Sequence, residues 1–208
     1  DYENVTVDEE YAAYYDQLFD ALLANGITPM ICLEHYELPG YLLEKYGGWG
    51  SKTVVELFVR YAEQVFARYH PKVTRWFTFN EPIVVQTRVY LDALRWPYEQ
   101  NTSTWMQWNY HKVLATASVV KRFRELGYPG TVGCILNPEV TYPRSRAPHD
   151  LRAAKIYDLF YNRMFLDPLV HGRYPQALFT LLAQHQVQWD YTADELALIA
   201  DNTVDELG

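Results

Sequence analysis

Cysteine is scarce in this sequence of 208 residues, which argues against a fold held together by disulfides. The two cysteines, Cys32 and Cys134, both lie in apolar runs that are typical of buried strands. A buried cysteine behaves as a small hydrophobic residue. We therefore expect two free thiols and a protein of a reducing compartment, the cytoplasm.

The sequence also lacks long apolar runs and an excess of basic residues. No stretch approaches the roughly 20 apolar residues that a membrane-spanning helix needs. Lys and Arg number 18 against 26 Asp and Glu, which gives a net charge of −8. Surfaces that bind nucleic acid carry a basic excess instead. We expect neither a membrane nor nucleic acid as a partner.

Metal-binding patterns are missing as well. None of the six histidines shows the spacing of a zinc site. Glu34 and Glu37 flank His35, yet we expect no metal there and no cofactor.

The sequence does contain a regular alternation of strand and helix patterns. Three apolar, partly β-branched runs are predicted as strands buried on both faces, at residues 27–33, 72–79 and 131–136. A first helix is expected between the capping box Thr6-Val7-Asp8-Glu9 and Asn25-Gly26. Further helices are predicted at residues 53–66, 103–126, 148–165, 176–185 and 194–200.

This alternation is typical of a parallel sheet with crossover helices. Three parallel strands alone would leave two unpaired edges beside large apolar faces. A closed (β/α)8 barrel has eight strands in about 250 residues. We therefore expect an α/β fold in which residues 1–208 form one domain, about three βα units of a partial (β/α)8 TIM barrel.

Several aromatic and histidine positions are interpreted as structural. Trp49, after paired glycines, is expected to anchor a loop, and Trp76 to lie in the core. His111 is expected to face inward on its helix. Residues 87–102 are irregular and aromatic, with Trp96 among them, and are predicted as a loop over a cleft.

The candidate site lies in the stretch Trp76-Phe77-Thr78-Phe79-Asn80-Glu81-Pro82. Pro82 cannot donate to a sheet ladder, so the strand should end near Glu81. Active sites of parallel barrels lie at this carboxyl end of the strands. A carboxyl group beside aromatic neighbours resists ionisation, which raises its pKa and suits it to general acid catalysis. The alternative is an ordinary polar strand exit.

Four motifs stand in order along the chain. They are His35-Tyr36-Glu37-Leu38-Pro39, Tyr46-Gly47-Gly48-Trp49, Thr78-Phe79-Asn80-Glu81-Pro82 and Phe165-Leu166-Asp167-Pro168. In their order and approximate spacing they resemble glycoside hydrolase family 1. The resemblance extends over essentially the whole chain. It implies a retaining β-glycosidase on a (β/α)8 barrel, acting on a small-molecule carbohydrate.

The resemblance also implies roles for individual residues. Glu81 matches the general acid/base of the family, and Asn80 the residue that binds the sugar 2-hydroxyl. His35 matches a ligand of a glycone hydroxyl, against the alternative of a core histidine. Asn137, at the end of the third predicted strand, resembles a residue on the leaving-group side.

The sequence departs from the family pattern in one important respect. Retaining chemistry needs a second carboxylate as nucleophile, and the Glu-Asn-Gly motif that supplies it in the family is absent here. We therefore expect a central segment of the enzyme that is inactive alone.

The substrate class stays open. Tyr36-Glu37 resembles the bacterial 6-phospho-β-glucosidase branch, whereas the proline of Asn80-Glu81-Pro82 is commoner outside that branch. A plain β-glucosidase and a non-catalytic carbohydrate-binding relic are the alternatives. A third alternative is a metal-dependent barrel hydrolase, which predicts loss of activity with chelators. Gluco or galacto preference and a homo-oligomeric state are also left open.

Overall fold

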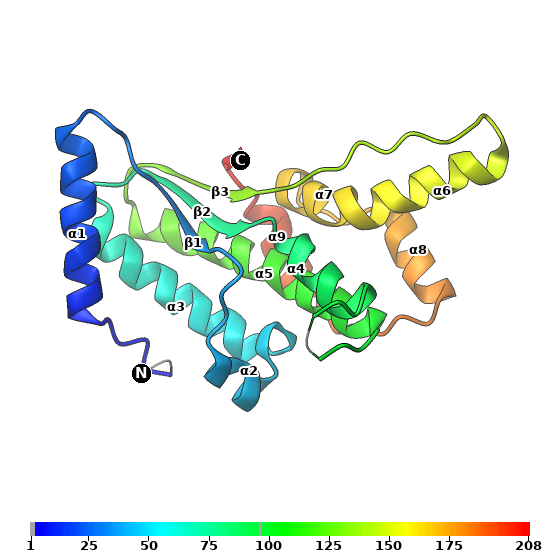
Figure 1. Cartoon of the computed structure of the whole chain (residues 1–208), viewed down its shortest axis with the longest axis horizontal. Helices are drawn as coiled ribbons and strands as arrows, with labels where there is room; N and C mark the ends of the chain where they lie inside the picture. Colours follow the sequence, from blue (N-terminus) through cyan, green and yellow to red (C-terminus); the bar gives the residue numbers. More distant parts are fainter. Residues whose placement is uncertain (1–2, 96) are drawn as a thin grey trace.

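The computed structural model describes residues 3–95 and 97–208, and its centre is a parallel sheet. The strands are β1 (Met30–Glu34), β2 (Arg75–Asn80), β3 (Thr131–Ile135) and β4 (Glu206–Leu207), and they neighbour one another in chain order (Figure 1). We expected three strands. The fourth strand, β4, has only two residues, too few to show an apolar pattern in the sequence.

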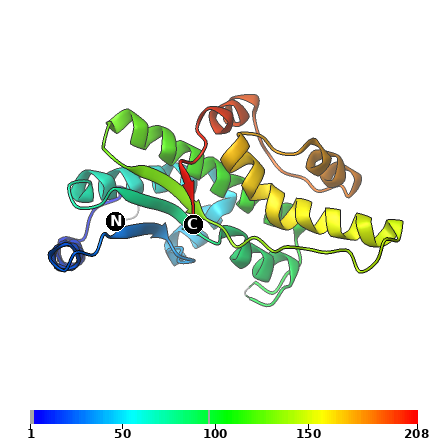
Figure 2. The ribbon, with the colours of Figure 1, turned by 90° about the horizontal axis from the view of Figure 1, so that it is seen from above.

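One helix, α1 (Glu9–Ala24), precedes the first strand, and further helices follow each of the first three strands. These are α2 (Gly40–Tyr46), α3 (Lys52–Tyr69), α4 (Pro82–Gln86), α5 (Thr102–Leu126), α6 (Pro148–Asp158), α7 (Met164–His171), α8 (Gln176–Gln184) and α9 (Ala193–Asp201). Helical turns η1 (Gly48–Gly50), η2 (Thr87–Leu91) and η3 (Leu159–Arg163) connect them. Helices α3 and α5 lie side by side against one face of the sheet, and α6 projects from the body (Figures 1 and 2).

The core lies between the sheet and helices α3 and α5. Trp76 of β2 is fully buried against Phe66 of α3, with ring centroids 5.0 Å apart. Phe66 in turn contacts Phe123 of α5. The predicted core position of Trp76 is confirmed.

Strand β1 is less buried than expected. Ile27, which precedes the strand, and Met30, which begins it, are about half exposed, at 52% and 53%. Because β1 lies at one edge of the described sheet, its first residues have fewer neighbours than those of the central strands.

The helix ends depend on side-chain caps, and one predicted cap was wrong. Asp8 caps α1 by accepting hydrogen bonds from the backbone of Glu10 and Tyr11, so the helix begins after Asp8 and not within the box that starts at Thr6. At α9 the predicted capping box is confirmed, with Thr192 and Glu195 bonded reciprocally.

We expected residues 87–102 to be irregular throughout, but the first five of them are helical. Pro82 fits the first turn of a helix, and α4 continues directly into the π-helical turn η2. Tyr90 is buried against Trp108, with ring centroids 5.1 Å apart. Trp96 lies outside the described residues.

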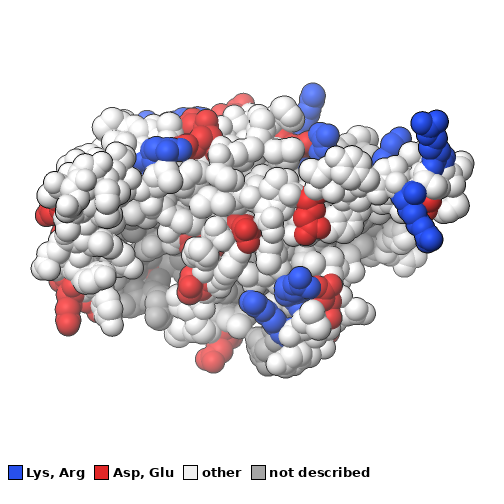
Figure 3. Space-filling view, turned by 45° about the horizontal axis from the view of Figure 1, so that its top comes forward, with Lys and Arg blue, Asp and Glu red and all other residues white. Residues whose placement is uncertain are grey.

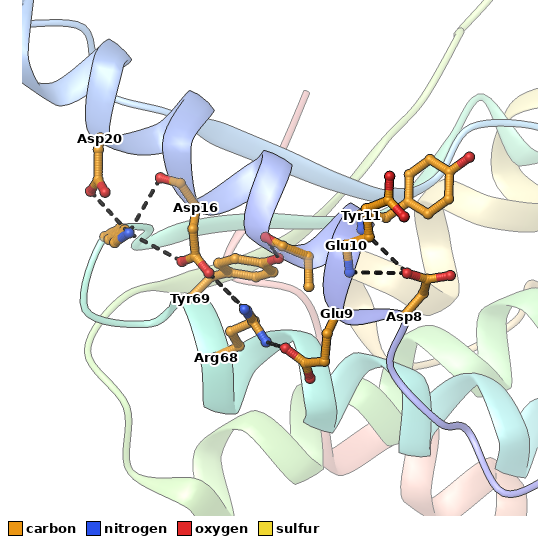
Figure 4. Close-up of polar contacts among 10 residues, drawn as sticks. Asp8, Glu9, Glu10, Tyr11, Asp16, Asp20, Arg68 and Tyr69 are labelled. Carbon is orange, nitrogen blue, oxygen red and sulfur yellow. Dashed lines mark hydrogen bonds and ion pairs between the residues drawn. The ribbon is translucent and has the colours of Figure 1, made fainter.

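Polar contacts fasten α1 to α3 on the outside of the molecule (Figure 4). Arg68 binds both Glu9 and Asp16, at 2.8 Å each, and the Tyr69 hydroxyl donates to the Ala12 carbonyl at 2.9 Å. Hydrogen bonds from Arg68 lower the pKa of the Asp16 carboxyl. These contacts fix the position of α1 at the margin of the sheet.

Three further observations concern the surface, the helices and the cysteines. On the face seen in Figure 3, Lys and Arg are dispersed among Asp and Glu. Within residues 3–95 and 97–208, no helix is long and apolar enough to cross a membrane. Cys32 and Cys134 are free thiols.

Candidate active site

The carboxyl end of β2 places Asn80 and Glu81 at the same end of the sheet as the residues that follow β1. The ladder between β2 and β3 is irregular between Phe77 and Asn80. Beyond it, the Glu81 N–H donates to the Ile135 carbonyl at 2.8 Å. Glu81 itself has a left-handed backbone, with φ 43°, and its side chain is partly buried. Such conformations are uncommon for residues other than glycine and concentrate at functional sites.

Tyr36, which follows β1, connects the predicted site residues. Its hydroxyl donates a hydrogen bond to Oε2 of Glu81 and accepts one from Nδ2 of Asn80 at 3.1 Å. Tyr36 also has a left-handed backbone, with φ 79°. Burial, and then the nearby Glu81 carboxylate, raise the pKa of the Tyr36 phenol to about 12. The phenol is therefore a proton donor at neutral pH.

His35 completes this group. Its ring stands edge-on to Tyr36, with centroids 4.9 Å apart, and the side chain is exposed. This exposure favours a binding role for His35 over the alternative of a core histidine. We call His35, Tyr36, Asn80 and Glu81 the Tyr36 cluster.

Asn137 lies apart from the Tyr36 cluster. It lines a cavity of about 390 Å³ beyond the end of β3, together with Glu139, Tyr157 and Tyr161. The rings of Tyr157 and Tyr161 stack, with centroids 5.4 Å apart, and the Tyr157 hydroxyl donates to Glu139. Among the described residues, no hydrogen bond joins Asn137 to Asn80 or Glu81.

The cavity and the cluster are nevertheless neighbours. Burial raises the pKa of Tyr161 to about 12, and the charges of Glu139 and Glu81 act in the same direction. Val84, three residues after Glu81, also lines the cavity, so the cavity lies next to the exit of β2. From the sequence, Tyr157 and Tyr161 were only part of a predicted helix, because nothing in a helical pattern marks which face meets a distant strand end.

A buried ion pair lies next to the Tyr36 cluster, at the end of β1. Nζ of Lys112, on α5, lies 2.9 Å from Oε2 of Glu34, the last residue of β1, and both side chains are almost fully buried. The ammonium group also lies 4.7 Å from the ring centroid of Phe79. Nothing in the sequence indicates this pair, since 78 residues separate its members.

The interpretations of Trp49 and His111 as structural are confirmed. Trp49 is 2% exposed, and its carbonyl lies 2.7 Å from Nδ1 of His111, which is itself buried. The loop after α2 is therefore fixed to α5. The described part of the chain contains no group of three or more His, Cys, Asp or Glu side chains placed to hold a metal ion.

Comparison with known proteins identifies the same family over nearly the whole chain. The model of glycosyl hydrolase family 1 matches residues 3–208. The 6-phospho-beta-glucosidase GmuD of Bacillus subtilis is 38% identical over 202 residues, which are 97% of this chain and 43% of that protein. Beta-glucosidase A of Acetivibrio thermocellus is 33% identical over 187 residues, 90% of this chain and 42% of its own length.

Solved structures agree in fold. The psychrophilic beta-glucosidase BglU from Micrococcus antarcticus superposes with a TM-score of 0.87 at 34% identity, over 98% of this chain and 43% of that one. The chain thus spans less than half the length of these relatives. Its four parallel strands and their helices are part of a (β/α)8 barrel, as predicted. The chain belongs to glycosyl hydrolase family 1.

Proposed function

We propose that the polypeptide to which this chain belongs is a retaining β-glycosidase that hydrolyses 6-phosphorylated β-glucosides or galactosides, with Glu81 as general acid/base. The Tyr36 cluster carries this proposal. It holds a carboxyl group at the carboxyl end of a barrel strand, beside an amide and an exposed imidazole. Sites that protonate a glycosidic oxygen need such a carboxyl group.

The other residues have supporting roles in this mechanism. Asn80 hydrogen-bonds the sugar 2-hydroxyl, whose hydrogen bonds strengthen as the oxocarbenium-like transition state forms. His35 binds another glycone hydroxyl. Asn137 and the cavity that it lines receive the leaving group. The nucleophile, a second carboxylate about 5–5.5 Å from Glu81, comes from outside residues 1–208, so these residues alone do not turn over substrate.

Two observations support a preference for 6-phosphorylated substrates. Tyr36-Glu37 resembles the bacterial 6-phospho-β-glucosidase branch, and the relative GmuD is a 6-phospho-beta-glucosidase. Beta-glucosidase A and BglU support the plain glucoside as the alternative. The two substrates differ by a dianionic group, and a site built to bind a polar group strongly rejects an analogue that lacks it.

Kinetics with the full-length polypeptide test this proposal. For 4-nitrophenyl β-glucoside with and without a 6-phosphate, we expect kcat/KM to be about 100-fold higher for the phosphorylated compound. Equal values, or a higher value without phosphate, would establish the plain β-glucosidase. Sugar binding in calorimetry without hydrolysis of either compound would establish the non-catalytic relic.

A further inference from the structure

We infer that Tyr36 is a positioning residue for the acid/base: its hydroxyl fixes the Glu81 carboxyl at the strand end and sets the pH range over which that group delivers a proton. This inference rests on the proposed function of Glu81. It assigns a task to a side chain that the family resemblance marks only as a sign of substrate class.

The contacts of Tyr36 carry the inference. One hydroxyl is bound by two side chains of β2 and its exit, because it donates to Glu81 and accepts from Asn80. Loss of the Tyr36 hydroxyl would therefore release both groups at once. Its ring is held separately, by the edge-on contact with His35.

The backbone is arranged to make these contacts. Tyr36 and Glu81 follow adjacent parallel strands, and both adopt left-handed conformations that side-chain-bearing residues rarely take. The backbone thus turns soon after β1 and directly after β2, and the side chains of Tyr36 and Glu81 meet between the two strand ends. We see no other hydrogen-bond partner of the Glu81 carboxyl among the described residues.

The chemistry of the Tyr36 hydroxyl determines how its hydrogen bond affects the ionisation of Glu81. A neutral hydroxyl that donates to a carboxylate stabilises the ionised form over the protonated form. Glycosidic bond cleavage needs the protonated form, so the Tyr36 hydroxyl limits activity at high pH. In the second half of the reaction the ionised form acts as base, and there the same hydrogen bond assists.

Other titratable or charged groups lie near the pair and are the same in Tyr36→Phe as in the parent. They come from β1 and its exit, from α5, from η2, from the loop after β3 and from η3, and are His35, Glu34 with its partner Lys112, Arg88, Glu139 and Tyr161. Removal of one hydroxyl leaves all of these groups in place. A change in pH dependence is then attributable to the Tyr36–Glu81 hydrogen bond.

The test is Tyr36→Phe in the full-length polypeptide, since phenylalanine retains the ring and its contact with His35. We expect the alkaline limb of the kcat/KM profile to move up by about one pH unit, the size of one hydrogen bond to a charged group. We also expect kcat/KM for alkyl glycosides to fall about tenfold. Tyr69→Phe is the matched control, because it removes a hydroxyl that donates to the Ala12 carbonyl, away from the Tyr36 cluster, and it should move neither quantity.

A second measurement keeps the inference separate from the proposed activity. With glutamate labelled by 13C at the carboxyl carbon, the Glu81 signal is assigned by its absence in Glu81→Gln and titrated by NMR. A titration about one pH unit higher in Tyr36→Phe than in the parent supports the inference, whether or not any glycoside is cleaved. An unchanged titration, or an alkaline limb that coincides with that of Tyr69→Phe, would overturn it.

Discussion

Lys112 is a cation enclosed by the core. Its side chain is 1% exposed, and it reaches Glu34 beside the rings of Trp49 and Phe79. A buried charge is tolerated only when it is paired, because its hydration is lost. The pair therefore ties α5 to the end of β1, one residue before His35.

Lys112→Met removes one member of this pair and leaves Glu34 buried without a partner. We expect the free energy of unfolding, measured with urea, to fall by about 3–5 kcal/mol. Replacing Glu34 by leucine in the same chain should recover most of this loss. Lys121→Met is the matched control on the surface of α5, where solvent screens the exposed pair with Glu125 and its loss should change stability little. A loss no larger than that of the control would contradict this account of Lys112.

For individual residues, the sequence allowed the position of Glu81 along the chain to be predicted, but not the contacts between side chains. Pro82 marks the end of β2, so Glu81 could be placed at the strand end without coordinates. Tyr36 and Lys112 could not be assigned, because their partners come from other strands and helices. Hydrogen bonds across such separations leave no local pattern.

Among the elements, the pairing of β3 with β4 depends on one glycine. A Cβ at Gly133 would lie 2.5 Å from the backbone oxygen of Glu206 and 3.0 Å from the ring of Phe77. Both neighbours belong to the sheet, so neither can move aside without disturbing it. Only glycine allows the two strands to approach at this point.

Gly133→Ala should therefore detach β4 and cost about 1–3 kcal/mol through overpacking. The expected signature is faster hydrogen exchange at the Gly208 amide, which donates to the Cys134 carbonyl at 3.1 Å. Gly40→Ala is the control, because a Cβ there meets nothing within 4 Å. Unchanged protection at Gly208 would show that β4 is held by other contacts.

The long elements were predictable, and the short ones were not. Helix α5 and strands β2 and β3 lie within one to three residues of their predicted bounds, because each has a long periodic or apolar run. Helix α4 and turn η2 were missed, since Pro82 was interpreted only as the end of a strand. The Thr6 cap was wrong because Asp8, two residues later, offers an equally good acceptor.

At the scale of the whole molecule, the sheet is open at both sides. Within the described residues nothing pairs with the outer edges of β1 and β4, as expected for part of a barrel whose relatives are more than twice as long. Repeated strand and helix patterns were enough to predict this architecture. These patterns could not reveal which side chains lie opposite Glu81 in the barrel.

We propose that in the complete barrel Glu81 protonates the leaving group while a second carboxylate attacks the sugar. Glu81→Gln in the full-length polypeptide removes the proton donor and keeps the shape of the side chain. Alkyl glycosides have poor leaving groups that need protonation, whereas dinitrophenyl glycosides need little. Glu125→Gln, on the exposed face of α5, is the control for the loss of a carboxylate.

The decisive measurement is the ratio of kcat/KM for the parent and Glu81→Gln with each of these two substrates. We predict a loss of about 10²- to 10⁴-fold for the alkyl glycoside and a far smaller loss for the dinitrophenyl glycoside. An equal loss for both substrates would contradict the assignment of Glu81 as general acid.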